Sequence, residues 1–183
     1  MKRILFLSGM TALLLACSKK EETPTTPQPG GQTPATPVAL SVELIPGSYA
    51  DDAGEGYPVV WNEGDAVALY TLLADGSLAE PVKLTLGSNG EWSPALEYTE
   101  GNRYFACFPW REKFNGEVDA SASDDLHFFA QAIAGWVPVA DQSDPATSLK
   151  KSSLMTAAGT VTRSESGATL RLAFTPRMAL LSL

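Results

Sequence analysis

Hydrophobic and polar residues alternate along several short segments of the chain from Val38 onward. In residues 38–44 every second side chain is apolar, with Ala39, Ser41 and Glu43 between them. A period of two places one set of side chains on the buried face of a sheet. Similar patterns, or apolar runs bounded by turn residues, predict strands in five more segments: residues 65–72, 82–86, 91–98, 103–108 and 169–174.

Turn residues separate these predicted strands. Asp75-Gly76 and Asn89-Gly90 are turn pairs, and Asn-Gly suits the positive φ angles of a type I′ hairpin. Pro94 has no N–H to donate, so it confines the strand predicted at 91–98 to an edge or a bulge.

One segment has helical spacing. Apolar residues recur with a helical period over residues 126–133, and Gly135 follows, so we expect a short helix or a loop packed on the core. The rest of residues 111–159 shows no clear period. Many short strands without a long helix predict an all-β fold of the Greek-key β-sandwich type.

The first residues of the chain are typical of a secreted lipoprotein. Lys2 and Arg3 precede an apolar stretch over residues 4–15, which is shorter than the ~20 residues of a membrane-spanning helix. The stretch closes on Ala16-Cys17, which resembles a bacterial lipobox. That resemblance implies a signal peptide over residues 1–16, cleavage between Ala16 and Cys17, and a diacylglycerol on the Cys17 thiol with acylation of its amine. Several acyl chains hold a protein stably on a membrane.

Residues 17–37 are predicted to form a disordered tether between this lipid and the fold. Five prolines and five threonines stand between Glu21 and Pro37, which makes a packed core there impossible. An extended segment of this kind reaches ~60 Å at ~3 Å per residue. The acidic pair Glu21-Glu22 resembles signals that send Bacteroidetes lipoproteins to the outer cell face. We therefore expect an outer-membrane, surface-exposed, lipid-anchored protein with one β-sandwich over residues 38–183.

Charge and cysteine content restrict the possible partners. The net charge is −8, and ten acidic residues but no basic residue lie between Lys20 and Lys83. Nucleic acid is excluded as a partner, because binding phosphates requires lysine and arginine. The only other cysteine is Cys107, so no intrachain disulfide is expected once Cys17 carries lipid. Cys107 lies in an apolar run and is predicted to be a core residue.

The sequence carries few of the residues that catalysis requires. Its single histidine, His127, cannot form a zinc site without further nitrogen or sulfur ligands, and no nucleophile elbow accompanies it. No phosphate-binding glycine loop is present. Acidic residues are numerous enough for a glycosidase pair, but no two of them are singled out. We predict that the protein is not an enzyme and has no cofactor or metal.

Three motifs in order resemble the N-terminal domain of Bacteroidetes fimbrillin-like lipoproteins. They are VVWNEGDAVALY (59–70), YFACFPW (104–110) and LRLAFTPRMALLSL (170–183). One departure is Pro176, which stands where that family commonly has histidine. The resemblance implies a transthyretin-like β-sandwich and a fimbrial anchor or accessory subunit that assembles with other subunits by β-strand complementation. In the family a protease trims the exported pilin; no arginine lies between Cys17 and Arg103 for an arginine-specific one.

The apolar end of the sequence is expected to be the strand that precedes a domain boundary, in a fimbrillin-like chain truncated after it. A bare apolar edge strand promotes aggregation, so we expect it to meet a partner strand. The residues predicted for this partner edge are Leu172, Phe174, Met178, Leu180, Leu181 and Leu183.

The alternative function is a surface glycan-binding lipoprotein of a polysaccharide-uptake system. Trp92 and Trp136 lie near predicted turns and would then stack on sugar rings, whereas core packing is the usual role of such large side chains.

Overall fold

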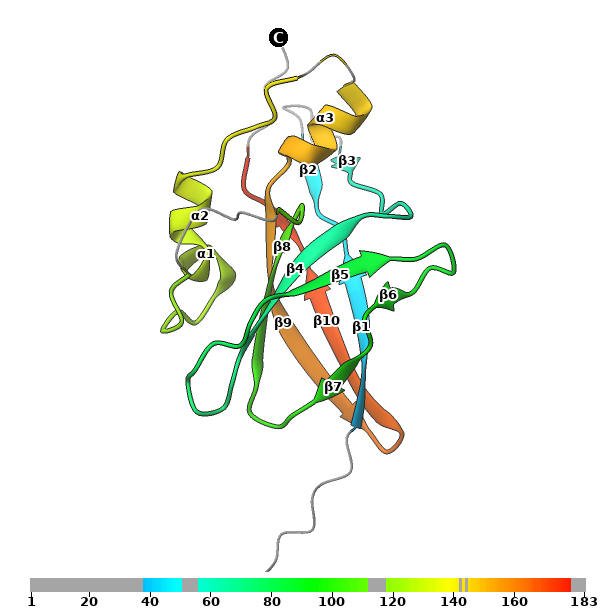
Figure 1. Ribbon diagram of the computed structural model, residues 1–183, viewed down its shortest axis with the longest axis vertical. Coiled ribbons are helices and arrows are strands. Elements are labelled where there is room, and N and C mark those ends of the chain that lie inside the picture. The colour runs from blue at the N-terminus through cyan, green and yellow to red at the C-terminus, as the bar shows by residue number, and fades with distance from the viewer. Residues whose placement is uncertain (1–37, 51–55, 112–117, 142, 144, 179–183) are drawn as a thin grey trace, which may run out of the picture. The chain divides into compact units, whose positions relative to one another are not determined.

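A computed structural model of the chain describes residues 38–50, 56–111, 118–141, 143 and 145–178 (Figure 1). The predictions made for residues 1–37, including Ala16 and Cys17, lie outside the described residues. So do those for Leu180, Leu181 and Leu183.

The described residues form mostly strands. The strands are β1 (Val38–Ile45), β2 (Ser48–Ala50), β3 (Gly56–Pro58), β4 (Ala66–Leu72), β5 (Val82–Leu86), β6 (Trp92–Ser93), β7 (Leu96–Tyr98), β8 (Arg103–Phe108), β9 (Met155–Ser164), β10 (Gly167–Ala173) and β11 (Thr175–Pro176). The helices are α1 (Asp125–Phe128), α2 (Ala130–Ala134) and α3 (Pro145–Ser152). The prediction of an all-β fold is confirmed.

Nine of these strands form one curled sheet. Its order is β6-β5-β4-β8-β9-β10-β1-β7, with β11 also paired to β9, while β2 and β3 form a separate pair. Neighbouring strands are antiparallel except β1 and β10, which are parallel. The strands at the two ends of the order, β6 and β7, are joined in the chain by Pro94 and Ala95 alone. The sheet therefore folds back on itself, and its two edges approach each other (Figure 1).

The two faces of the sheet bury different sets of side chains. Along β4, Val67 and Leu69 point to one face and Ala68 and Tyr70 to the other. We call the first set the inner cluster, which fills the curl with residues of β1, β4, β5, β8, β9 and β10. The second set is the outer cluster, which packs β4 and β8 against Phe128, Phe129 and Ala132 of the helical segment. One face of the sheet is thus covered by the sheet itself and the other by α1 and α2.

Strand β9 joins the two halves of the curl. Its residues 155–158 pair with β8, while residues 159–164 pair with β10. At the change of partners lies Gly159, where a Cβ atom would stand 2.6 Å from Leu170 Cδ1 and 2.9 Å from Tyr104 Cβ. Only glycine lets β10 and β8 come this close to the β9 backbone.

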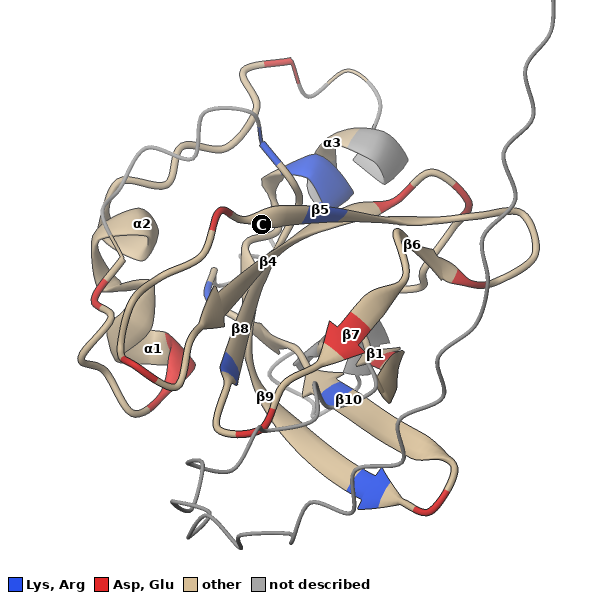
Figure 2. Ribbon diagram, turned by 60° about the horizontal axis from the view of Figure 1, so that its bottom comes forward, with Lys and Arg blue, Asp and Glu red and all other residues tan. Residues whose placement is uncertain are grey.

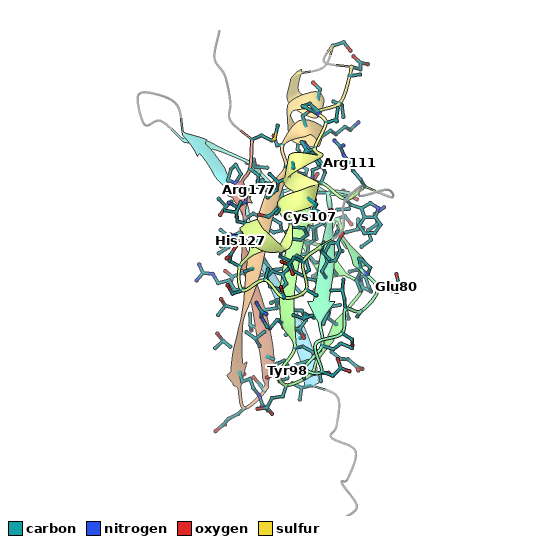
Figure 3. The ribbon with its side chains drawn as sticks, turned by 90° about the vertical axis from the view of Figure 1, so that its left-hand side faces the viewer. Glu80, Tyr98, Cys107, Arg111, His127 and Arg177 are labelled. Atoms are coloured by element: carbon teal, nitrogen blue, oxygen red, sulfur yellow. The ribbon has the colours of Figure 1, made fainter. Side chains whose placement is uncertain are left out.

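A hydrogen-bonded group fixes the chain just after β11. The Arg177 guanidinium donates to Asp125 Oδ2 at 2.5 Å and to Thr156 Oγ1 at 2.6 Å, and Thr156 Oγ1 donates to the same Asp125 oxygen at 2.5 Å. Both charged side chains are more than four-fifths buried. The group connects α1, β9 and the segment after β11 on the helical side of the sheet (Figure 3).

Most of the predicted elements are present. The six predicted strands all occur, although residues 91–98 are divided at Pro94 into β6 and β7. The helical segment forms α1 and α2, with Gly135 as the C-cap of α2. Cys107 is fully buried in the outer cluster, as predicted, and burial raises the pKa of its thiol. Strand β9 and helix α3 were not predicted.

We predict that Gly159→Ala lowers the free energy of unfolding by about 1–3 kcal/mol, because the added methyl overlaps Leu170 and Tyr104. Urea unfolding monitored by tryptophan fluorescence measures the change. The matched control is Gly167→Ala in β10, where the nearest atom to a new Cβ is 3.4 Å away. Equal stability of the two variants would contradict the role given to Gly159.

We also predict that Asp125 and Arg177 are coupled by about 1–3 kcal/mol in a double-mutant cycle with Asp125→Asn and Arg177→Met. Losing one partner leaves the other charge largely buried without its counter-ion. The comparison pair is Arg163 and Glu100, which are 3.7 Å apart and more than half exposed. That exposed pair should couple by less than about 0.5 kcal/mol. Similar coupling in the two pairs would refute the prediction.

Candidate functional site

The two edges of the curled sheet face each other across a groove, which we call the seam groove. It has a volume of about 320 Å³. Its lining comes from β1 and from the segment that carries the two terminal strands, β6 and β7. The lining residues are Leu40, Ser41, Val42, Gly90, Glu91, Trp92, Pro94, Ala95 and Leu96.

One residue of β1 keeps unpaired backbone groups at this groove. The outer edge of β1 pairs with β7 only over residues 38–40. Further along, the Leu44 carbonyl accepts a 2.9 Å hydrogen bond from Trp61 Nε1, while the Ile45 carbonyl faces β10 and accepts from Phe174 N. Backbone groups of alternate residues point to the same side of a strand, so Val42 points outward with Leu44. Within the described part of the chain, its N–H and C=O have no hydrogen-bond partner.

The reason for this gap is the proline between β6 and β7. Leu40 pairs with Leu96, so the same antiparallel register would place Val42 opposite Pro94. Proline has no backbone N–H and cannot donate to the Val42 carbonyl. The ladder stops here, and β1 presents a short open edge beside an apolar groove.

The turn that bounds this edge is formed by the Trp-Asn-Glu-Gly-Asp segment, residues 61–65. Asp65 Oδ2 accepts from Asn62 N at 2.6 Å, and Gly64 adopts a φ of 84°. The half-buried Trp61 ring packs edge-on against three aromatic rings at 5.1–5.5 Å: those of Trp92, Phe108 and Phe174. The same side chain therefore caps β1 and supports Trp92 in the wall of the groove.

Trp92 and Trp136, the two residues predicted for glycan stacking, lie apart. Trp92 packs on the inner cluster and Trp136 on the outer cluster, so they are on opposite faces of the sheet. The Arg111 guanidinium covers the Trp136 ring at 3.6 Å, and Trp136 Nε1 donates to the Ser152 carbonyl at 2.8 Å. The structure does not bring the two rings into one platform.

The partner edge predicted at the end of the sequence requires a correction. Leu172 lies in β10, which pairs with β9 on one side and β1 on the other, and its side chain is fully buried. Phe174 is also buried in the inner cluster, and Met178 is half-buried against the outer cluster. An alternating apolar run is equally typical of a central strand, which is what β10 is. The open edge belongs to β1. The sequence feature behind it is Pro94, which the register of β1 and β7 places opposite Val42.

The described residues contain no cluster of three His, Cys, Asp or Glu side chains placed to hold a metal ion. His127 is exposed at the end of α1, and its Nδ1 lies 2.8 Å from Asp124 Oδ2 (Figure 3). The Asp124 carboxylate accepts a hydrogen bond from the backbone N–H of His127 and another from its ring. These hydrogen bonds lower the pKa of Asp124. This pair caps the helix. Among the described helices, none has the length and apolar character to span a bilayer.

Comparison with known proteins shows that the fold is similar to that of a fimbrial protein. The chain is similar to the crystal structure of a fimbrial protein from Bacteroides ovatus, with a TM-score of 0.59 and 26% sequence identity. The alignment covers 76% of this chain and 28% of that protein, so the chain spans less than a third of its length. No family model and no curated protein sequence matches the chain.

Proposed function

We propose that this chain is a cell-surface fimbrial subunit, acting as an anchor or accessory component. The observation that carries this proposal is the similarity of its fold and sequence to a fimbrial protein. The lipobox at Ala16-Cys17 and the proline- and threonine-rich residues 17–37 support an outer-membrane lipoprotein whose domain, residues 38–183, stands away from the membrane. The role is structural and requires no catalytic group.

The proposed mode of assembly is β-strand addition at the open edge of β1. An extended segment of another subunit that lies in the seam groove would pair with the free N–H and C=O of Val42. Its side chains would contact Trp92 and Leu96, which are half-buried in the isolated chain. Strand addition combines main-chain hydrogen bonds with side-chain pockets, so one groove supplies both affinity and selectivity.

Two substitutions at the seam groove test this mode. Val42→Pro removes the outward N–H, and proline is tolerated where an edge N–H faces away from the sheet. Ala95→Lys places a charge at an exposed position of the groove. The control is Ala134→Lys at an exposed position of α2. Circular dichroism establishes that each variant is folded.

The readout is a blot of boiled and unboiled outer-membrane fractions. We expect the unchanged protein and Ala134→Lys to give a ladder of species that collapses on boiling, because strand-added subunits resist SDS. Val42→Pro and Ala95→Lys should lose most of this ladder. A full ladder from both groove variants would overturn strand addition at β1, and a wild-type protein that never forms higher species would overturn the fimbrial role itself.

A further inference from the structure

A second groove collects positive charge in an otherwise acidic molecule. The described residues include three lysines, Lys83 of β5 and Lys150 and Lys151 of α3, and all three line one groove of about 520 Å³. We call it the lysine groove. Its other walls are the turn at residues 62–65 and the segment Phe108, Pro109 and Trp110 after β8. Figure 2 shows the basic segments of β5 and α3 in blue. The net charge of the chain is −8. A groove lined by all the described lysines therefore differs in charge from the rest of the protein surface.

Lys150 is fixed in the wall of the lysine groove. Lys150 Nζ donates to the Val60 carbonyl at 2.7 Å and to the carboxylate of Asp65. Both side chains of this ion pair are at least four-fifths buried, so the pair holds α3 against the turn. Arg111 supports the same helix, because its guanidinium donates to the Lys151 carbonyl at 3.2 Å.

The other two lysines are exposed. Neither Lys83 nor Lys151 lies within ion-pair distance of a described carboxylate, and Lys151 interacts with Asp141 only at longer range. Asp65 is already paired with Lys150, so Glu63 is the remaining carboxylate of the lining. Among the lining residues, two exposed cations stand against one carboxylate, and Asp141 lies outside the lining. The open part of the groove therefore has a positive balance, which attracts an anion.

An aromatic ring lies beside these charges. Trp110 is half-buried, with Lys83 Nζ 6.0 Å from the ring centroid, and its backbone N–H donates to the Ala66 carbonyl at 2.8 Å. Trp110 Nε1 has no hydrogen-bond partner among the described residues, so it is available as a donor. A flat apolar ring next to cationic donors suits a sugar ring that carries a carboxylate better than it suits a flexible acidic side chain.

We propose that the lysine groove binds an acidic glycan, through a uronic acid residue. Its carboxylate accepts hydrogen bonds from Lys83 and Lys151, and its ring contacts Trp110. The volume of the groove is in the range of small-molecule sites and accommodates a short oligosaccharide. This site is separate from the seam groove and does not depend on strand addition. It also differs from the stacking site predicted at Trp92 and Trp136.

Calorimetric titration of the full chain with trigalacturonate, and with uncharged trigalactose as the matched ligand, tests this proposal. The test variant is the double substitution Lys83→Gln/Lys151→Gln. The control is Arg163→Gln/Arg171→Gln, which removes the same charge from exposed positions of β9 and β10. We expect the lysine variant to bind trigalacturonate about tenfold more weakly and the arginine variant to bind it within about twofold of the unchanged chain.

Three results would overturn the proposal. The first is no preference of the unchanged chain for trigalacturonate over trigalactose. The second is an equal loss of affinity in the lysine and arginine variants, which would indicate nonspecific attraction. The third is binding of hexaglutamate as tight as that of trigalacturonate, with the same dependence on Lys83 and Lys151, which would assign the groove to acidic peptides. Circular dichroism of both variants separates loss of the site from loss of the fold.

Discussion

The hydrogen bond from Trp61 Nε1 to the Leu44 carbonyl is the contact on which both grooves depend. It fixes the end of β1 against a turn that lies 17 residues further along the chain. The Trp61 ring then brings together aromatic side chains from β6, β8 and the residue between β10 and β11. Without this ring the inner cluster would lose packing at the place where the two sheet edges approach each other. The same turn ends in Asp65, which holds Lys150 and shapes the lysine groove on its other side.

How far the sequence predicts the fold depends on the surroundings of each strand. Strand β10 has a clear alternation because its residues 168, 170 and 172 are buried while the residues between them are exposed. Strand β9 has no such signal: residues 155–157 are buried on both faces, and the chain continues with small and polar residues through Gly159. The strand that joins the two halves of the sheet is therefore the hardest to predict, since its pattern is set by contacts on both sides.

The sites are less predictable than the strands, because they depend on contacts between segments that are far apart in the chain. An apolar run such as residues 170–174 has the same pattern at an edge as in the centre of a sheet, so the pattern alone does not show that Leu172 lies in a central strand. The open groups of Val42 follow from its register against Pro94, which no local pattern encodes. Lys83 and Lys150 are likewise far apart in the chain and share a groove only through the packing of α3 on the turn. The Trp61 motif was recognisable from the sequence, but not its role in supporting both grooves.

The open edge of β1 is short, and its length limits what strand addition can gain there. Strand pairing with β7 ends at Leu40, and Trp61 already occupies the Leu44 carbonyl, so Val42 is the residue between them whose outward N–H and C=O are both free. Two new hydrogen bonds contribute only about 1–3 kcal/mol together, because water already satisfied those groups. Most of the affinity for an added strand must therefore come from burying apolar surface on Trp92 and Leu96. A short edge of this kind resists unselective pairing with other chains, while the shape of the groove selects the segment that fits.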